Sequence, residues 1–425
     1  MKKYSIYTFV IVILLCNACK RENESQVDNV IPIKIDGNFY VDKFSNLFSD
    51  VQYVALEETR NSIVGTVSRL EITKGGDLVV FDARAGAVFR FASDGKFLNN
   101  IGFRGSGDME YISPRDMKYD PFSDKVLVWD SAKRTILTYD LDGKAVSKIQ
   151  LPWVIFTFGI IDEEHLICYM NNGEDIRGRE MGTNYKIIRR DGLIEKEFGK
   201  YGIEKAGFYP PSENTFCFQL DRCLCFPPYS STLFAIDGDS LNAIATFDLF
   251  DHTIPQEWLH GRYDEFYENL QKYPDLIEIN AVYETDQYYL LSLAKDRVTL
   301  LCMVRKDDGR IKSISRIIIN DLYGFVGNTN LIQAYDNRLY FPIESIEFEG
   351  QVKFLQSFSE GADLKKIMLK RMTPSALAQY FGEDGASAYI DSIKSTTFNL
   401  QIGEREMMDK MSKNSNPIIQ ICTLK

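Results

Sequence analysis

The stretch "FDARAGAVFRFASDGKFLNNIG", residues 81–102, returns in altered form as "WDSAKRTILTYDLDGKAVSKIQ" at residues 129–150. At an offset of 48 residues, both copies carry Asp at their second position and the tripeptide Asp-Gly-Lys further on. Hydrophobic positions coincide as well, since Val88 aligns with Ile136 and Phe91 aligns with Tyr139. A pattern that recurs at a fixed interval indicates a chain built from repeated structural units.

Each unit reads as four short strands. In the second copy these are "PRDMKYD", "KVLVWD", "TILTYDLD" and "AVSKIQL", separated by turn residues. An Asp-Gly pair, which favours a tight hairpin, lies between the third and fourth strands. Such pairs recur at intervals of 48, 49, 46 and 71 residues, at Asp94-Gly95, Asp142-Gly143, Asp191-Gly192, Asp237-Gly238 and Asp308-Gly309. Repeated four-stranded units of about 40 to 50 residues are typical of β-propeller blades.

Six such units can be counted, which predicts an all-β fold: a six-bladed β-propeller of four-stranded antiparallel blades. The sixth unit begins at "LIQAYDNRLYFPIES" (331–345), continues in "KFLQSF" (353–358) and lacks a last strand of its own. Two strand-like segments remain, "VQYVALEE" at 51–58 and "NPIIQICTLK" at 416–425. We expect these N- and C-terminal strands to meet in one blade and close the ring, because closure removes exposed sheet edges.

Two short helical insertions interrupt the strand pattern, at about residues 255–276 and 373–395. In the first, apolar side chains recur at helical spacing, at Leu259, Tyr263, Phe266 and Leu270. In the second, Thr373 is a plausible N-cap before Pro374 at the first helical position. Both are expected to pack on the outside or rim of the ring, with a lid over a site as the functional alternative.

The composition agrees with a large, strand-rich, acidic protein. Of its 425 residues, 45% are hydrophobic, and 28 Phe and 23 Tyr favour strands. The net charge is −11, from 49 basic and 60 acidic residues. A surface that binds nucleic acid needs clustered Lys and Arg, and no such block follows the first residues. The sequence therefore predicts no nucleic-acid partner.

The first residues read as an export signal. Lys2 and Lys3 precede an apolar run at residues 4–15, which is too short to span a bilayer. Ala18 then precedes Cys19, which matches a bacterial lipoprotein signal whose cysteine becomes the lipidated first residue. Cys16 and Asn17 depart from the commonest form of that signal, so a conventionally cleaved signal peptide or a short membrane anchor is the alternative.

These features divide the chain into three parts. Residues 1–19 are the signal peptide with the lipidation cysteine, residues 20–38 a tether, and residues 39–425 a single six-bladed propeller. The predicted location is the cell envelope, lipid-anchored to the outer membrane and facing either the periplasm or the cell surface.

The chain resembles a family, the six-bladed β-propeller lipoproteins of Bacteroidetes, which are related in pattern to NHL-repeat propellers. The resemblance rests on Cys19, on "VQYVALEE", on the phrase "NIGFRGSGDMEYISPRDM" (100–117) and on the terminal "NPIIQICTLK". Asp108-Met109 stands where the family often has Pro-Gly, so that loop is expected to bend differently. The resemblance implies the fold and the envelope location, and it implies no chemistry.

One face of the predicted ring is the expected ligand site. In an up-and-down blade, the turns between second and third strands share a face with the blade-to-blade connections, and loops on a rigid scaffold often carry binding residues. Several Arg forks near one opening would suit a carboxylate or a sugar acid. The candidates on this face are Arg84, Arg104, Glu110, Tyr111, Arg134, Arg177, Tyr229 and Arg297.

Other motifs are interpreted as structural. Asp82 and Asp130, each at the end of a second strand, are expected to cap the next turn rather than bind metal. The six cysteines after residue 19 lie mostly in apolar runs and are expected to be core residues. The "GFRGSG" stretch (102–107) lacks the strand-to-helix context of a phosphate loop and is expected to be a tight connection.

The sequence gives little support for catalysis. It has three histidines and neither a G-x-S-x-G nor an H-E-x-x-H motif, so no catalytic residue, metal ligand or cofactor is predicted. A Ca²⁺ site made of carboxylates and backbone oxygens would leave no spacing signature, so it stays open.

The leading hypothesis is a non-catalytic, lipid-anchored module of the envelope. It would bind a ligand or a protein on the candidate face, as an accessory to glycan or nutrient uptake. The alternatives are a metal-dependent hydrolase or lyase with carboxylates in the central channel, and a structural subunit of an outer-membrane complex.

Overall fold

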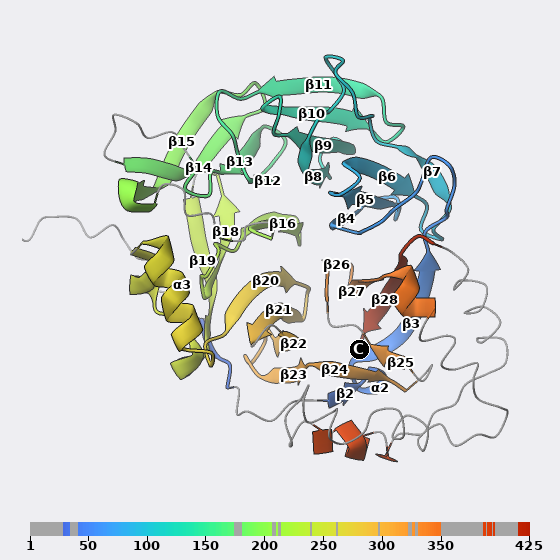
Figure 1. Ribbon diagram of the computed structural model, residues 1–425, viewed down its shortest axis with the longest axis vertical. Helices are drawn as coiled ribbons and strands as arrows, with labels where there is room; N and C mark the ends of the chain where they lie inside the picture. The colour runs from blue at the N-terminus through green and yellow to red at the C-terminus, as the bar shows by residue number, and fades with distance from the viewer. Residues whose placement is uncertain are drawn as a thin grey trace, which may run out of the picture.

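The chain forms a closed ring of six antiparallel sheets around a central axis (Figure 1). The computed structural model describes residues 29–34, 41–173, 181–205, 210, 214–238, 240–260, 262–295, 298–321, 325–327, 330–349, 386–387, 389–392, 394–395 and 415–425. The predicted six-bladed β-propeller is confirmed.

The first three blades each use four strands that follow one another in sequence and pair antiparallel. Blade 1 consists of β4 (Arg69–Ile72), β5 (Leu78–Asp82), β6 (Ala87–Phe91) and β7 (Phe97–Asn100). Blade 2 consists of β8 (Pro114–Asp120), β9 (Lys125–Asp130), β10 (Thr135–Asp140) and β11 (Ala145–Gln150). Blade 3 consists of β12 (Thr157–Ile160), β13 (His165–Tyr169), β14 (Met181–Arg189) and β15 (Ile194–Gly202).

Blades 4 and 5 follow the same plan. Blade 4 consists of β16 (Phe216–Gln219), β17 (Arg222–Cys225), β18 (Thr232–Asp237) and β19 (Ser240–Asp248). Blade 5 consists of β20 (Glu278–Glu284), β21 (Tyr288–Lys295), β22 (Val298–Arg305) and β23 (Ile311–Ser315). The first strand of each blade is the innermost, and it contacts the first strand of the next blade around the axis (Figure 1).

Blade 6 is assembled from both ends of the chain. Its inner strands are β26 (Gln333–Tyr335) and β27 (Arg338–Ile343), its third strand is the C-terminal β28 (Ile418–Leu424), and its outermost strand is the N-terminal β3 (Phe48–Ala55). The predicted closure of the ring by the two terminal segments is thus confirmed. The segment 353–358, assigned to this blade from the sequence, lies outside the described residues.

Residues 29–34 and 41–55 form an N-terminal strap along the outside of the ring. Strand β1 (Val30–Pro32) adds in parallel to β19 of blade 4, and Ile31 and Ile33 are buried against that blade. Strand β2 (Val41–Lys43) then pairs in parallel with β24 (Ile317–Asn320), which β25 (Phe325–Gly327) extends. The short helix α2 (Phe44–Leu47) leads into β3. Residues 29–34 lie within the predicted tether (20–38), and a strand was not expected there because three residues are too few to show periodicity.

The predicted insertion at 255–276 is helical. It contains the 3₁₀ turn η3 (Gln256–His260) and the helix α3 (Tyr263–Lys272), which follow the 3₁₀ turn η2 (Phe250–His252). Phe266 of α3 is buried against Tyr229 and Ile254, so the insertion packs on blade 4. Of the second insertion, residues 386–387, 389–392 and 394–395 are described and helical, and the rest lies outside the described residues.

Local signals behave as the sequence indicated. The glycines of all five Asp-Gly pairs lie between the third and fourth strands of their blades and have positive φ, from 55° at Gly238 to 88° at Gly95 and Gly192. Positive φ is accessible to glycine without a Cβ clash, which explains the repeated motif. A further single 3₁₀ turn, η1 (Ile203–Lys205), follows blade 3.

Asp82 and Asp130 cap turns, as predicted. The Asp130 carboxylate accepts hydrogen bonds from the backbone N–H groups of Ile112 at 2.7 Å, Ser113 at 3.0 Å and Ala132 at 3.0 Å. Asp82 makes the equivalent bonds one blade earlier, to Gly65, Thr66, Arg84 and Ala85. Each carboxylate therefore ties the segment that enters a blade to the turn after its second strand.

The core consists of apolar layers between neighbouring blades. Trp129 of blade 2, for example, packs in one buried cluster with Phe158 and Leu166 of blade 3. Five of the six cysteines after residue 19 are buried and Cys217 is partly buried, and all six are free. Burial raises the pKa of the Cys168 and Cys302 thiols to about 12, so both stay protonated core residues. Over the ranges that the structure describes, no helix is both long and apolar enough to cross a bilayer.

Candidate functional site

The ring has two faces that carry different turns. The turn face carries the turns between first and second strands, such as residues 335–337, and the Asp-Gly turns. The connection face carries the turns between second and third strands, such as residues 83–86, and the links between blades, such as residues 101–113. The described candidates from the sequence all lie on the connection face.

Three of these candidates, Arg84, Arg104 and Arg134, are exposed on blades 1 and 2. Arg104 approaches the turn that holds Arg84, because a Cβ at Gly86 would lie 4.0 Å from Arg104 Nη1. Arg134 donates from Nη1 to the carbonyl oxygen of Pro152 at 3.2 Å. The structure thus brings Arg84 and Arg104 to adjacent segments, while Arg134 bonds to the link that follows its own blade.

The other described candidates have structural contacts. The Glu110 carboxylate is exposed and accepts the N–H of Gly107 at 2.8 Å. Tyr111 is buried and its hydroxyl donates to the carbonyl oxygen of Ile101 at 3.2 Å, and burial raises its pKa to about 12. Tyr229 is also buried, with its ring 4.8 Å from that of Phe266.

Cys19, Arg177 and Arg297 lie outside the described residues. A ligand site at the candidates on the connection face stays a prediction.

Buried and partly buried polar side chains of the innermost strands lie around the axis of the ring. Arg69 Nε lies 2.7 Å from Asp116 Oδ1, and Asp116 Oδ2 accepts the Thr157 hydroxyl at 2.7 Å, so these groups join blades 1, 2 and 3. Lys118 Nζ donates to the carbonyl oxygen of Phe216 in blade 4 at 2.9 Å. Burial lowers the pKa of Lys118 and raises the pKa of Glu71, because both charged forms lose hydration.

A cavity of about 270 Å³, the channel mouth, opens from this axis at the turn face. Its walls include Glu71, Gln219 and Gln333 of the innermost strands, and its rim is formed by turns such as residues 220–221 and 335–337. Gln219 Nε2 donates to the carbonyl oxygen of Ala334 at 2.9 Å, which fixes the side chain across two blades. A buried carboxylate in the wall, Glu284, is paired with Arg222 and Lys306 at 2.6 Å each.

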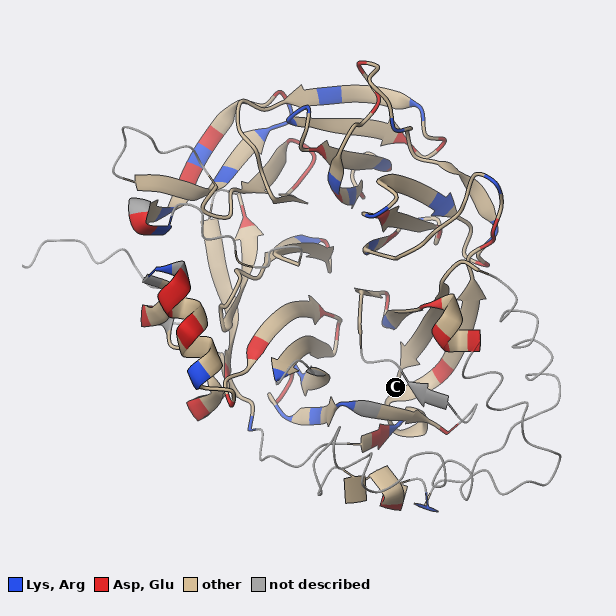
Figure 2. Ribbon diagram, viewed as in Figure 1, with Lys and Arg blue, Asp and Glu red and all other residues tan. Residues whose placement is uncertain are grey.

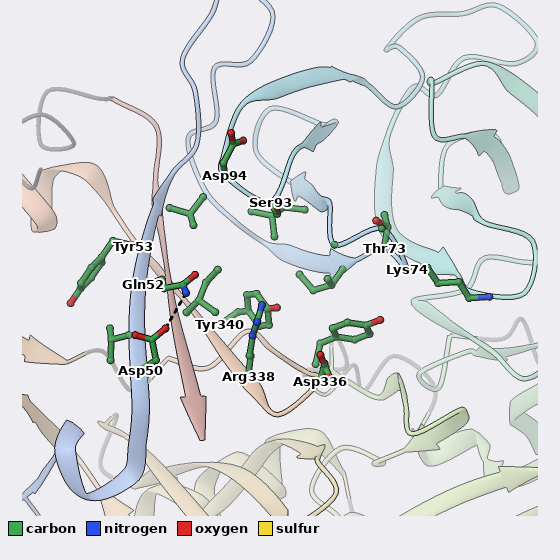
Figure 3. Close-up of a pocket in the computed structure, with 18 residues that line it drawn as sticks. Asp50, Gln52, Tyr53, Thr73, Lys74, Ser93, Asp94, Asp336, Arg338 and Tyr340 are labelled. Atoms are coloured by element: carbon green, nitrogen blue, oxygen red, sulfur yellow. Dashed lines mark hydrogen bonds between the residues drawn. The ribbon is translucent and has the colours of Figure 1, made fainter. Parts of the chain in front are cut away.

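A wider groove of about 860 Å³ lies beside the channel mouth, at the seam between blade 6 and blade 1 (Figure 3). This seam groove is lined by residues 50–54, 72–76, 78, 93, 94, 335, 336, 338, 340 and 421. It shares Ile72, Lys74, Tyr335 and Asp336 with the channel mouth, so the two hollows are continuous along the turn face.

The seam groove combines charged and aromatic groups. Arg338 at the start of β27 and Lys74 in the turn after β4 are exposed, and no ion pair within the described part of the chain holds either cation. The carboxylates of Asp50, Asp94 and Asp336 also line the groove, and Asp50 accepts the amide of Gln52 at 3.0 Å (Figure 3).

Two tyrosines complete the groove. Tyr335 is 41% exposed and stands where the groove meets the channel mouth, whereas Tyr340 is buried in the floor. Burial raises the pKa of Tyr340, and the neighbouring Arg338 partly offsets that rise. An Arg fork, carboxylates, hydroxyls and aromatic surface together suit a polar ligand of moderate size, and the volume is in the range of small-molecule sites.

Sequence reasoning missed this groove, although one signal pointed to it. The prediction that residues 51–58 close blade 6 already placed that segment next to blade 1. The width of the opening depends on how side chains of three distant segments pack, and no local pattern records that. Over the described ranges, no group of three or more His, Cys, Asp or Glu side chains is arranged to hold a metal ion.

Comparison with known proteins identifies a family. The sequence model of a family described as "Domain of unknown function (DUF4934)" matches residues 29–372. A search of curated proteins gives no match.

The solved structures that are similar to the chain include the following three. A protein of Bacteroides fragilis described as exported is 15% identical with a TM-score of 0.68, over 93% of this chain and all of that one. A DUF4221 member from Bacteroides vulgatus is 10% identical with a TM-score of 0.41, over 63% of this chain and 85% of that one. Virginiamycin B lyase from Staphylococcus aureus is 12% identical with a TM-score of 0.34, over 62% of this chain and 72% of that one.

Proposed function

This chain belongs to the DUF4934 family, and we propose that it is a non-catalytic binding module of the cell envelope that holds a glycan or a similar polar ligand in the seam groove. The observation that carries the proposal is the lining of that groove. The Lys74 ammonium offers a donor with no side-chain partner among the described residues, Arg338 bonds to Tyr340 and keeps further N–H donors exposed, and carboxylates offer acceptors beside them. Sugars present hydroxyls to such groups and their C–H faces to aromatic rings, and Tyr335 supplies an exposed ring.

The proposed anchoring rests on the N-terminal sequence. Cys19 would carry the lipid, and nine residues separate it from Asn29, where the described strap begins. At full extension nine residues span about 30 Å, so the outer edge of blade 4 would stay close to the membrane. The seam between blades 6 and 1 lies on the opposite side of the ring (Figure 1), where the groove would remain open to a diffusing ligand.

Anchoring is tested by comparing two cysteine variants of the full chain. Cys19→Ser should abolish incorporation of an alkyne-labelled fatty acid and release the protein from the membrane fraction. Cys16→Ser is the matched control, because it removes a thiol from the same signal without touching the lipidation position. Equal labelling of the two variants would contradict the anchor and leave the binding proposal untouched.

Ligand binding is tested by calorimetry with tri-galacturonic acid and maltotriose. We expect Arg338→Ala and Tyr335→Ala each to weaken binding of the bound sugar by about tenfold or more, since each removes a direct contact. Arg310→Ala is the control, because Arg310 is an 82% exposed arginine on another turn of the same face. Loss of binding in Arg84→Ala and Arg104→Ala, with Arg338→Ala unaffected, would move the site to the connection face and overturn the proposal. Failure of both sugars to bind would overturn the glycan class.

A further inference from the structure

A second cavity lies on the connection face, where blade 4 meets blade 5. It has a volume of about 310 Å³ and is bounded by the start of β20, by the residues before β16 and by the segment between β17 and β18. It shares no lining residue with the seam groove or the channel mouth. Any role of this cavity is therefore independent of the groove.

The chemical centre of this cavity is the carboxylate of Glu278, at the first position of β20. The side chain is half-buried, and no hydrogen bond or ion pair from the described part of the chain reaches its carboxylate. Burial alone raises its pKa, since the charged form loses hydration without gaining a partner. Leaving an acidic group in this state costs stability, which a bound cation would recover.

The rest of the lining is neutral. Asn280 is the extra residue of a β-bulge, since Ile279 and Ala281 pair with consecutive residues of β21, and bulges re-aim side chains. Asn214 adds a second exposed amide at the rim, and Phe226 and Tyr229 supply an aromatic wall. Amide oxygens and aromatic faces both attract cations, and none of the described residues that line the cavity is basic.

Acidic residues outnumber basic ones in the chain segment beside the cavity, although Lys295 at the end of β21 pairs with Asp275 at 3.6 Å. The insertion that contains α3 packs on Tyr229, a lining residue, through Phe266. Between residues 250 and 278 the chain has seven carboxylates and two basic residues, and acidic residues dominate the surface of α3 (Figure 2). This potential favours the approach of a cation and disfavours a carboxylate or a sugar acid at this point of the connection face.

We propose that the cavity between blades 4 and 5 binds a cationic nitrogen group, the ammonium or guanidinium head of a lysine or arginine side chain or of a similar amine, with Glu278 as its counter-ion. One carboxylate matches one positive charge, and the volume suits such a head group with part of its alkyl stem. The amide oxygens of Asn280 and Asn214 accept its remaining N–H groups. This site goes beyond the groove function and would let the connection face recognise a basic segment of a partner.

The test titrates the full chain with trilysine by calorimetry, and with trilysine acetylated on all three ε-amines. We expect trilysine to bind and the acetylated peptide not to bind. Glu278→Gln should weaken the binding of trilysine by about tenfold or more, since a charge-assisted bond is lost. Glu265→Gln is the matched control, because it removes one exposed charge from α3 at no contact with the cavity, and it should change affinity less than about twofold.

A second variant is expected to strengthen binding, which a misfolded protein would not do. Asn280→Asp places a second carboxylate at the exposed bulge and should tighten the binding of trilysine. Equal weakening by Glu278→Gln and Glu265→Gln, or equal binding of the two peptides, would overturn the site in favour of general charge attraction. Absence of trilysine binding would overturn it outright. Arg338→Ala should leave trilysine binding unchanged, so the failure of this site and of the groove are distinguishable.

Discussion

Blade 2 and blade 6 have the same four-stranded shape and are held together in different ways. Blade 2 folds from residues 114–150, and a single carboxylate, Asp130, ties its entering segment to its central turn. Blade 6 joins residues 333–343 to β28 and β3, which come from opposite ends of the chain. Asn416, just before β28, does the tying there, since its amide oxygen accepts the N–H of Val64 at 2.9 Å, 352 residues away.

This difference coincides with the position of the open groove between blades. Within blade 2 and its neighbours, strands that are close in sequence set the spacing, and apolar layers fill the junctions. At the seam, Val54, Leu56 and Ile419 belong to a buried apolar cluster, while the turn-face end opens into the groove. The seam, which joins segments far apart in the sequence, therefore carries the groove with the largest volume of the three hollows described above.

The strongest way to break this comparison is to remove residues 416–425. Strand β28 is central in blade 6, and six of its seven residues, Ile418 to Thr423, pair with both β27 and β3. Without this strand the seam cannot close. The free-energy cost should exceed the roughly 5–15 kcal/mol by which domains are stable, so the whole ring should unfold. Near-ultraviolet circular dichroism would show the loss of fixed packing. A truncated chain that keeps a native spectrum and a cooperative melt would mean that blade 6 is dispensable.

Asp130→Ala probes the local staple of blade 2. The change removes a fully buried carboxylate and leaves the partly buried N–H groups of Ile112, Ser113 and Ala132 without their acceptor, and should cost about 3–5 kcal/mol in urea denaturation. Asp82→Ala, in the matching position of blade 1, should cost a similar amount. A loss below about 1 kcal/mol in both variants would show that the carboxylates do not hold the blades.

The same two blades show what the sequence could predict. The repeat, the Asp-Gly hairpins and the capping role of Asp82 are local patterns, and each was confirmed. Closure by 51–58 and 416–425 was also predicted, because unpaired strands need a partner. The strap strand β1 was missed, since Val30–Pro32 is too short to show a period.

The cavities could not be predicted, for a physical reason. The groove depends on the side chains of Asp50, Lys74 and Arg338, which meet only after the ring has closed. The cavity of Glu278 depends on a bulge whose position the sequence does not mark. Candidate arginines, in contrast, were chosen by strand order alone, which fixes the face and leaves the contacts open.

Asn416→Ala tests the hydrogen bonds that the Asn416 side chain makes across the seam. Besides the bond to Val64, the Asn416 amide donates to the carbonyl oxygens of Glu57 at 3.1 Å and Ser62 at 2.5 Å. We expect a loss of about 2–4 kcal/mol, because these buried groups would remain unpaired. Trilysine binding between blades 4 and 5 should persist, whereas binding in the seam groove should weaken. Equal weakening of both would indicate a general loss of structure instead of a seam effect.

His165→Gln removes the most local of these contacts, and we expect its effect on stability to be the smallest. In blade 3, His165 Nδ1 lies 2.9 Å from Asp162 Oδ1 and Nε2 lies 3.0 Å from Glu195 Oε2. The hydrogen bond to Asp162 raises the pKa of His165 above its usual value, and the nearby carboxylates add to the rise. A raised folded-state pKa stabilises the fold fully below about pH 6.5, the unfolded value, and the gain disappears as pH rises through the folded pKa. The contact is partly exposed, so its contribution stays below about 1 kcal/mol.

Urea denaturation at pH 6.0 and pH 8.5 should therefore show a loss in His165→Gln at pH 6.0 only. Glu163→Gln, an exposed neighbour, is the control and should show no such difference. A loss of equal size at both pH values would mean that the imidazole acts by packing and not by charge. Because the His165 side chain bonds to Asp162 and Glu195 within blade 3, we expect the substitution to leave binding in the seam groove unchanged. That outcome would separate the local bonds within a blade from the long-range bonds that close the ring.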